Sequence, residues 1–434
     1  MKKKFHIITY GCQMNKYDSM AITERLMELG HVPTEDVGEA DVIIVNTCAV
    51  REHAEKRALG RIRNLLGLKK SNPELKVGII GCVAQEYGEK LFELIPELDF
   101  VVGTEQLDKI EEIVSGKLGC GVFVESREDF LGVSAPAHIE SGQVSSFVTI
   151  MRGCNNFCSY CIVPFVRGRE RYRPPELIID EVRRAVRLGV KEITLLGQNV
   201  NSYRFNDLDF ADLLRLVAKT EGLKKLRFVT NHPKDFTTKI LDVVEEFENK
   251  IPPAFHLPLQ SGSDKILSAM NRKYTLSQYM KLVEQIYARF PKAAITTDII
   301  VGFPGESEED FMATIRAMEE VEFAGVFSFR YSPRPGTAAA RLPDDVPETV
   351  KLDRLKKVIE LGIKLAEKYS RKFIGTKQSV LVLGSDKKRP DMLRGTAPSG
   401  RTVVFPKTDE INPGDIIIIK ISDASAWVLF GEKE

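Results

Sequence analysis

The sequence predicts an α/β protein of three domains: an N-terminal doubly wound parallel α/β domain, a central partial (β/α)6 barrel and a small C-terminal β-barrel. Two series of alternating apolar strands and helices, separated by an aperiodic stretch, predict the first two domains. Short strands between Gly and Pro turns predict the third. The length of 434 residues agrees with several domains, because a single hydrophobic core rarely includes so many residues. We expect domains at 1–125, 147–370 and 371–434, with a linker over 126–146.

The N-terminal part alternates strand and helix, which is typical of a parallel sheet covered by helices. Its predicted strands are 5–9, 41–46, 76–80 and 100–103, and its predicted helices are 19–29 and 52–66. Residues 129–146 lack clear periodicity and carry Gly, Pro and Ser, as a linker does.

A second alternating series follows the linker. Its predicted strands are 147–151, 192–196, 225–229, 254–257, 294–301 and 325–331, with helices such as 176–188 and 306–321 between them. Six strand–helix units are too few for a closed eight-fold barrel, so we expect a partial one. A charged helix over about 347–372 leads to the predicted C-terminal strands 379–383, 402–405, 415–421 and 426–429.

The net charge of the chain does not by itself indicate a polyanionic partner. Lys and Arg number 62 and Asp and Glu number 61, a balance of +1, so any nucleic-acid surface must come from local clustering. Residues 371–434 carry 11 Lys and Arg against 8 Asp and Glu, which permits RNA binding without demanding it. The chain has neither an apolar run of about 20 residues nor a secretion signal, so we expect a cytoplasmic protein with no membrane association.

Seven cysteines in such a chain favour metal or catalytic use over disulfides. Three form the tight motif Cys154-x3-Cys158-x2-Cys161 just after the first barrel strand. Without a nearby His they do not complete a zinc site, but they can hold three irons of a [4Fe–4S] cluster and leave one iron open. A zinc knuckle or three buried cysteines are the alternatives. The spacing, with aromatic Tyr160, resembles the radical-SAM superfamily, in which the open iron binds S-adenosylmethionine (SAM).

Three further cysteines, Cys12, Cys48 and Cys82, each directly follow a predicted strand of the N-terminal sheet. The ends of parallel strands gather along one edge, so these thiols can converge on one metal centre. The alternative is three separate small residues that end buried strands. Cys120 belongs to neither triplet, and we assign it no role.

Together the two triplets, on an α/β domain ahead of a radical-SAM barrel and a small β-domain, resemble the methylthiotransferases over essentially the whole chain. Three segments, 153–170, 196–203 and 331–337, resemble the MiaB branch. The resemblance implies that all six cysteines are catalytic ligands of two [4Fe–4S] clusters and that the C-terminal domain is an RNA-binding, TRAM-like β-barrel. It also implies addition of a methylthio group to C2 of N6-dimethylallyladenosine at position 37 of tRNA, next to the anticodon.

In such a reaction two SAM molecules are used per turnover. One methylates sulfur held at the N-terminal cluster, and the other yields the radical that removes hydrogen from C2. The implied partners are the tRNA anticodon stem-loop and an electron donor such as flavodoxin or ferredoxin, and we expect a monomer. The alternatives are a RimO-like enzyme acting on a ribosomal-protein aspartate, a relative acting on threonylcarbamoyl adenosine, and a non-catalytic iron–sulfur RNA-binding protein.

Weaker signals surround the barrel motif. Gly197, Gln198 and Asn199, at the end of the second barrel strand, are candidates to bind the methionine end of SAM, and Gln260, Ser261 and Asp298 are candidates for its ribose or the substrate. The segment 301–306 resembles the family's adenosine-facing motif. Each of these groups has a turn or helix cap as its alternative.

Five arginines flank the barrel cysteines with aromatic residues between them, which favours phosphate contacts and base stacking. We expect RNA contact from them, with pairing to the barrel rim as the alternative. His256 is expected to be a core histidine. The arginines are Arg152, Arg167, Arg169, Arg171 and Arg173, and the aromatic residues are Phe165 and Tyr172.

Overall fold

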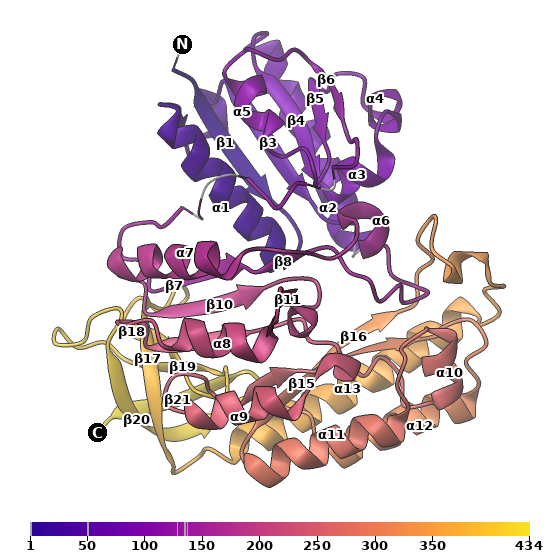
Figure 1. The fold of residues 1–434 in the computed structure, drawn as a ribbon, viewed down its shortest axis with the longest axis vertical. Coiled ribbons are helices and arrows are strands. Elements are labelled where there is room, and N and C mark those ends of the chain that lie inside the picture. Colours follow the sequence, from indigo (N-terminus) through magenta and orange to yellow (C-terminus); the bar gives the residue numbers. More distant parts are fainter. Residues whose placement is uncertain (1, 50–51, 128, 134–135, 137) are drawn as a thin grey trace.

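The N-terminal domain, the barrel and the C-terminal β-domain follow one another along the chain in a computed structural model that describes residues 2–49, 52–127, 129–133, 136 and 138–434. The N-terminal domain lies on top of the barrel, and the C-terminal domain lies at one lower side of it (Figure 1). No helix in these ranges is both long enough and apolar enough to cross a bilayer.

The N-terminal domain is a parallel sheet in the order β2-β1-β3-β4-β5-β6. Every residue of β3 is buried, because separate apolar clusters cover the two faces of the sheet. The strand order reverses between β1 and β3, so the domain is doubly wound as predicted. The strands are β1 Lys4–Thr9, β2 Val32–Pro33, β3 Val42–Thr47, β4 Lys76–Gly81, β5 Phe100–Val102 and β6 Gly121–Phe123.

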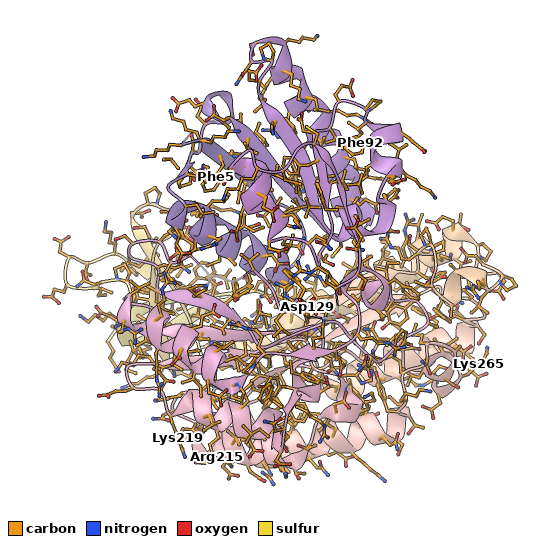
Figure 2. All side chains as sticks on the ribbon, turned by 45° about the horizontal axis from the view of Figure 1, so that its top comes forward. Phe5, Phe92, Asp129, Arg215, Lys219 and Lys265 are labelled. Atoms are coloured by element: carbon orange, nitrogen blue, oxygen red, sulfur yellow. The ribbon has the colours of Figure 1, made fainter. Side chains whose placement is uncertain are left out.

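Its helices are α1 Gln13–Glu28, α2 Glu52–Leu66, α3 Cys82–Tyr87, α4 Lys90–Leu94 and α5 Lys109–Val114. Helix α1 begins six residues earlier than predicted, because its polar first turn lacks the apolar spacing used to find it. Asp129 lies at the junction between the N-terminal domain and the barrel (Figure 2). Of the predicted linker 126–146, residues 128, 134, 135 and 137 lie outside the described residues, and its last two residues already belong to the next strand.

The barrel consists of two parallel three-stranded sheets, β7-β10-β13 and β14-β15-β16. Between β13 and β14 the backbone ladder is interrupted, and the Asn231 amide donates to the His256 carbonyl at 3.1 Å. The six strands keep their chain order around this break, which agrees with a partial (β/α)6 barrel. They are β7 Ser145–Thr149, β10 Glu192–Leu196, β13 Lys225–Phe228, β14 Ala254–His256, β15 Ala294–Val301 and β16 Gly325–Arg330.

Helices cover the outside of the barrel (Figure 1) and bury its apolar strand faces. They are α7 Pro175–Arg187, α8 Phe210–Ala218, α9 Thr238–Glu246, α10 Asp264–Ala269, α11 Leu276–Arg289 and α12 Glu308–Val321. Helix α13 Glu348–Arg371 leads out, and a hairpin of β11 Arg204–Phe205 and β12 Leu208–Asp209 precedes α8.

The predicted first barrel strand is in fact two elements. Strand β7 ends at Thr149, and β8 Met151–Arg152 pairs antiparallel with β9 Arg171–Tyr172. This two-stranded ribbon closes the base of the cysteine loop.

The C-terminal domain is a closed barrel in the order β17-β18-β19-β21-β20. Its strands are β17 Lys377–Ser385, β18 Met392–Thr396, β19 Thr402–Pro406, β20 Ile416–Ala424 and β21 Val428–Lys433, of which β18 was not predicted. Buried Arg401 joins it to the central domain by donating to the carbonyl of Ala324 and, at 2.8 Å, to the Ser370 hydroxyl.

Candidate active site

The three N-terminal cysteines follow three adjacent strands of one sheet. Cys12 follows β1 as the N-cap of α1, Cys48 follows β3, and Cys82 follows β4 as the first residue of α3. Neighbouring strands lie about 4.8 Å apart, so the three thiols are gathered at one sheet edge, as predicted. Gly11, with φ +111°, has no space for a side chain, because a Cβ there would lie 2.3 Å from the Cβ of Cys48.

Cys12 is exposed at this edge, whereas Cys48 and Cys82 are buried. A hydrogen bond from the Cys48 thiol, with the charge of Arg167 as a further contribution, lowers the pKa of Cys12 to about 5. Burial raises the pKa of Cys82. The edge therefore holds one accessible thiolate beside two enclosed thiols.

A barrel arginine reaches this N-terminal edge. Arg167 ends the short helix α6 Val163–Arg167, which begins two residues after Cys161. Arg167 is 4% exposed, and it donates to Asn15 Oδ1 at 2.8 Å and Asp18 Oδ2 at 3.3 Å. Its charge also acts on Cys82, whose thiolate it stabilises. The two cysteine triplets are thus joined through one helix.

The barrel cysteines lie on the loop between β8 and α6. Gly153, with φ +78°, begins the loop, and a Cβ there would lie 2.0 Å from the Arg169 carbonyl oxygen. Buried Arg272 donates to Cys158 Sγ at 3.4 Å. Sequence reasoning missed Arg272, because it follows α10 in a segment with no motif that links it to the cysteines.

Burial also dominates the chemistry of the barrel thiols. It raises the pKa of Cys154 to about 11 and that of Cys161 to about 12. A metal centre that binds these sulfurs as thiolates would offset this cost. The donor set therefore fits a thiolate-ligated cluster.

A single-metal site does not fit either triplet. Within the described ranges, no three His, Cys, Asp or Glu side chains are grouped so that they could hold one ion. Three thiolates leave a tetrahedral zinc one ligand short, whereas they can hold three irons of a four-iron cube and leave the fourth iron open.

The segment predicted to bind the methionine end of SAM packs under the barrel loop. Gln198 Oε1 accepts from the Gly153 backbone at 2.6 Å, and a Cβ on Gly197 would lie 2.5 Å from Met151 Cγ. Asn199 donates to Asp235 at 2.8 Å, while its own Oδ1 is buried without a hydrogen-bond partner among the described residues.

The other three candidates differ in what they can reach. Gln260, with φ +72°, keeps a buried Oε1 that has no described partner. Asp298 is partly exposed and lies 3.4 Å from His256 Nε2, so the predicted core histidine instead pairs with a carboxylate. Ser261 is fully buried and bonded to Thr314 at 3.3 Å, which favours its alternative role in a turn.

Three family models match separate stretches of the chain. The model described as "Uncharacterized protein family UPF0004" matches residues 4–103, the radical SAM superfamily matches 148–318, and the TRAM domain matches 371–433. The first stretch contains the strand-end cysteines, and the second contains the barrel loop.

Curated relatives match nearly the full length. The tRNA-2-methylthio-N(6)-dimethylallyladenosine synthase of Caldicellulosiruptor saccharolyticus is 44% identical over 99% of this chain and 92% of its own. Those of Dictyoglomus thermophilum (44%, covering 99% and 98%) and Clostridium novyi (43%, covering 99% and 96%) are similar. The chain belongs to this synthase family. As a radical SAM protein it uses an iron–sulfur cluster and SAM.

Solved structures share the fold of this synthase-family chain. The radical SAM methyltransferase TsrM from Kitasatospora setae aligns with a TM-score of 0.60 at 14% identity, covering 78% of this chain and 77% of its own. The cobalamin-dependent radical enzyme OxsB aligns at 0.51 and 12% identity, covering 84% and 56%. At such identities the likeness shows the fold alone, and it confirms the predicted α/β architecture.

Four of the five flanking arginines are held in ion pairs within the protein, which favours the alternative of pairing over the expected RNA contact. Arg152 pairs with Asp18, Arg171 with Glu105, and Arg173 with Glu181 at 2.8 Å, while Arg167 is placed as described above. Three carboxylates thus pair with four guanidinium groups near the junction between the synthase-family N-terminal domain and barrel, because Asp18 serves both Arg152 and Arg167. Arg169 differs, since it lies over the Phe157 ring at 4.4 Å.

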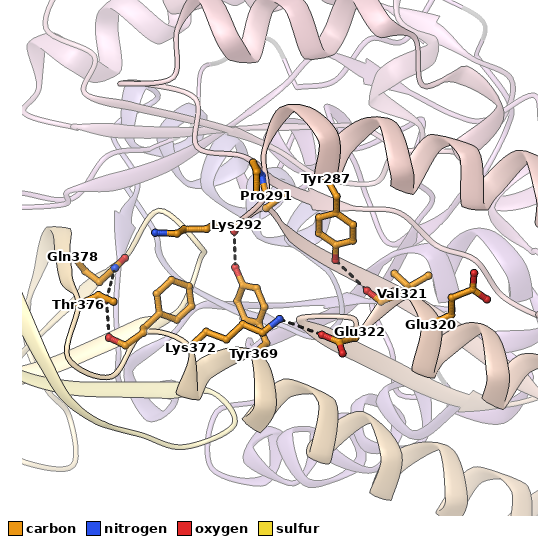
Figure 3. Close-up of a pocket in the computed structure, with 12 residues that line it drawn as sticks. Tyr287, Pro291, Lys292, Glu320, Val321, Glu322, Tyr369, Lys372, Thr376 and Gln378 are labelled. Atoms are coloured by element: carbon orange, nitrogen blue, oxygen red, sulfur yellow. Dashed lines mark hydrogen bonds and ion pairs between the residues drawn. The ribbon is translucent and has the colours of Figure 1, made fainter.

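A cavity of about 420 Å³ lies away from both cysteine sites, between the barrel and the C-terminal domain (Figure 3). Tyr287 donates to the Val321 carbonyl and Tyr369 to the Lys292 carbonyl at its wall, each at 3.1 Å. None of the predicted site residues lines it. In this member of the synthase family, the cavity is therefore separate from the two cysteine sites.

Proposed function

We propose that this chain adds a methylthio group to C2 of N6-dimethylallyladenosine at position 37 of tRNA. The observation that carries the proposal is the pair of cysteine triplets, one on a radical SAM loop and one at a sheet edge, in a full-length relative of enzymes with that name. The chemistry needs a radical, because C2 of adenine lacks an acidic hydrogen.

The proposal assigns Cys154, Cys158 and Cys161 to the cluster that binds SAM, and Cys12, Cys48 and Cys82 to a second [4Fe–4S] cluster that holds sulfur. When bound, the barrel cluster supplies the electron that splits one SAM into methionine and a 5′-deoxyadenosyl radical; a second SAM supplies the methyl group. Gln198 fixes the loop backbone at Gly153, and Arg272 donates to Cys158. Asp298 and the unpartnered amide oxygens of Gln260 and Asn199 remain candidates to bind SAM or substrate.

The proposed partners follow from the same assignment. The match of residues 371–433 to the TRAM domain supports binding of the tRNA anticodon stem-loop by the C-terminal barrel. A flavodoxin or ferredoxin would supply the electron. We propose that the chain acts as a monomer in the cytoplasm.

Replacing all three of Cys12, Cys48 and Cys82 by Ala tests whether the two proposed clusters have separate roles. Iron content should fall by about half, since two four-iron clusters become one. SAM cleavage to 5′-deoxyadenosine should persist, and the methylthio nucleoside should disappear from tRNA by mass spectrometry. Iron content equal to that of the wild type would contradict the second cluster, and persistence of the methylthio nucleoside would contradict its sulfur-holding role.

A further inference from the structure

The contact between Arg167 and the N-terminal cysteines has no role in the function proposed so far. We infer that Arg167, carried by the barrel loop, supplies the buried positive charge that sets the reduction potential of the N-terminal iron–sulfur cluster. The inference rests on the proposed assignment of a cluster to Cys12, Cys48 and Cys82.

Helix α6 is held in the N-terminal domain by apolar packing. Ile162 and Val166 belong to the same buried cluster as Cys82, Val83 and Ala84, although they come from the barrel loop. The Thr104 hydroxyl donates to the Val166 carbonyl. This packing fixes the backbone at the point where the Arg167 side chain leaves it.

The Arg167 guanidinium is connected to all three strand ends. It lies beside Cys82, whose thiolate its charge stabilises, and it donates to Asn15 Oδ1 at 2.8 Å. The Asn15 amide nitrogen donates to the carbonyls of Tyr10 at 2.9 Å and Thr47 at 2.7 Å, which lie just before Cys12 and Cys48. Asn15 Oδ1 also lies 3.6 Å from Cys12 Sγ.

One carboxylate serves two buried guanidinium groups here. Asp18 accepts from both Arg152 and Arg167, and all three side chains are at most 3% exposed. The sum of these three charges is +1. Of the two arginines, Arg167 is the one whose charge acts on Cys12 and Cys82 among the described residues, so the excess charge lies beside these sulfur ligands.

A buried positive charge next to a cluster favours its reduced form, since reduction adds negative charge where solvent screens little. Exposed arginines would not have this effect, because water screens them. Arg167 therefore acts as a positioning residue through charge and hydrogen bonding at the sulfur ligands.

The test uses the full-length chain with Cys154, Cys158 and Cys161 replaced by Ala, so that only the N-terminal cluster is reconstituted. Its reduced fraction is followed by electron paramagnetic resonance during a potentiometric titration. Arg167→Gln keeps a hydrogen-bonding side chain without charge, and Arg167→Lys keeps the charge. Arg171→Gln is the matched control, because Arg171 lies on the same segment and pairs with Glu105 but has no described contact with a cysteine.

Arg167→Gln should lower the reduced-to-oxidised ratio at a given potential about tenfold, a shift of about 59 mV for a one-electron couple. Arg167→Lys and Arg171→Gln should titrate like their parent. Equal potentials in Arg167→Lys and Arg167→Gln, with iron intact, would overturn the inference and leave the proposed function standing. Absence of iron in the parent, before any arginine is changed, would overturn the second cluster itself.

Discussion

Gly153 sets the path of the barrel cysteine loop at the level of a single backbone position. Its φ of +78° is one that L side chains rarely adopt, and the Arg169 and Gly168 carbonyl oxygens occupy the space where a Cβ would lie. Its amide also donates to Gln198. The cysteines that follow depend on this position for their direction.

We expect Gly153→Ala to disrupt the barrel cluster. A Cβ 2.0 Å from a carbonyl oxygen forces the loop to shift, in addition to about 1–2 kcal/mol for the left-handed backbone. Formation of 5′-deoxyadenosine by the reconstituted enzyme should fall at least tenfold, because the displaced loop no longer holds the cysteines in the geometry that the reaction needs. Gly116→Ala is the control, because φ is +75° there but no atom lies within 4 Å. Equal activity of the two variants would show that the close contact is unimportant.

His232 makes stability depend on pH. It is buried, its Nδ1 accepts from the Lys234 backbone, and burial lowers its pKa to about 2. The unfolded chain binds a proton near pH 6.5 that the folded chain does not, so stability is full above pH 6.5 and falls as pH drops below it.

We expect the free energy of unfolding of the wild type to fall by up to about 1.4 kcal/mol per pH unit below 6.5 from this group alone. His232→Asn should lack that part of the slope. Urea titrations of both proteins at pH 7.5 and 5.5 measure it, and parallel losses in the two proteins would remove His232 as the cause.

The positions of the N-terminal cysteines could be predicted from the sequence, but the ion-pair partners of the arginines could not. A residue just past a strand has a position fixed by local structure, so Cys12, Cys48 and Cys82 could be assigned to one edge. The partners of Arg152 and Arg171, Asp18 and Glu105, come from distant parts of the chain. Which carboxylate pairs with which arginine depends on how the domains pack together, and no local sequence pattern encodes that packing.

At the scale of elements, the turn between β17 and β18 projects positive charge from the C-terminal barrel. Lys387 and Lys388 are consecutive and exposed. Strand β18 itself was missed because Arg394, Gly395 and the polar residues before it weaken the strand pattern. All five of its residues pair with β19 and four of them pair with β17, so closure of the barrel overrides this weak local preference.

We expect the double variant Lys387→Ala and Lys388→Ala to bind tRNA more weakly. If each lysine neutralises one phosphate, the slope of log affinity against log salt should decrease by about 1.4–1.8. SAM cleavage should be unchanged. Lys219→Ala with Lys281→Ala is the control, because both lysines are exposed on the outer helical layer (Lys219 is labelled in Figure 2). Equal salt slopes in the two double variants would argue against this turn as an RNA contact.

At the scale of the whole molecule, buried polar contacts join the N-terminal domain to the barrel. Asp18 of α1 pairs with Arg152 and Arg167, and Tyr17 donates to Glu181 of α7 at 3.0 Å. The split of the barrel into two sheets and this docking were not evident in the sequence, because both depend on contacts between distant segments.

Asp18→Asn should strongly weaken this docking. It leaves two buried guanidinium groups without a carboxylate, at a cost of about 3–5 kcal/mol. We expect the urea unfolding midpoint to fall and faster proteolysis within 138–143. Asp180→Asn removes an exposed pair with Arg183 and should cost at most about 1 kcal/mol. A midpoint for Asp18→Asn equal to that of Asp180→Asn would show that the junction does not depend on this carboxylate.

The packing of α6 against the N-terminal domain also affects the order in which the two cysteine sites are completed during synthesis. The ribosome delivers the chain from its N-terminus, and domains fold as they emerge. The six strands of the first sheet and all three strand-end cysteines are complete before Cys154 is added. Arg167 comes later still, so the sheet edge is open to iron and sulfide until α6 arrives and covers Cys82. Under the proposed assignment of the two clusters, translation itself would let the N-terminal site assemble before the barrel site.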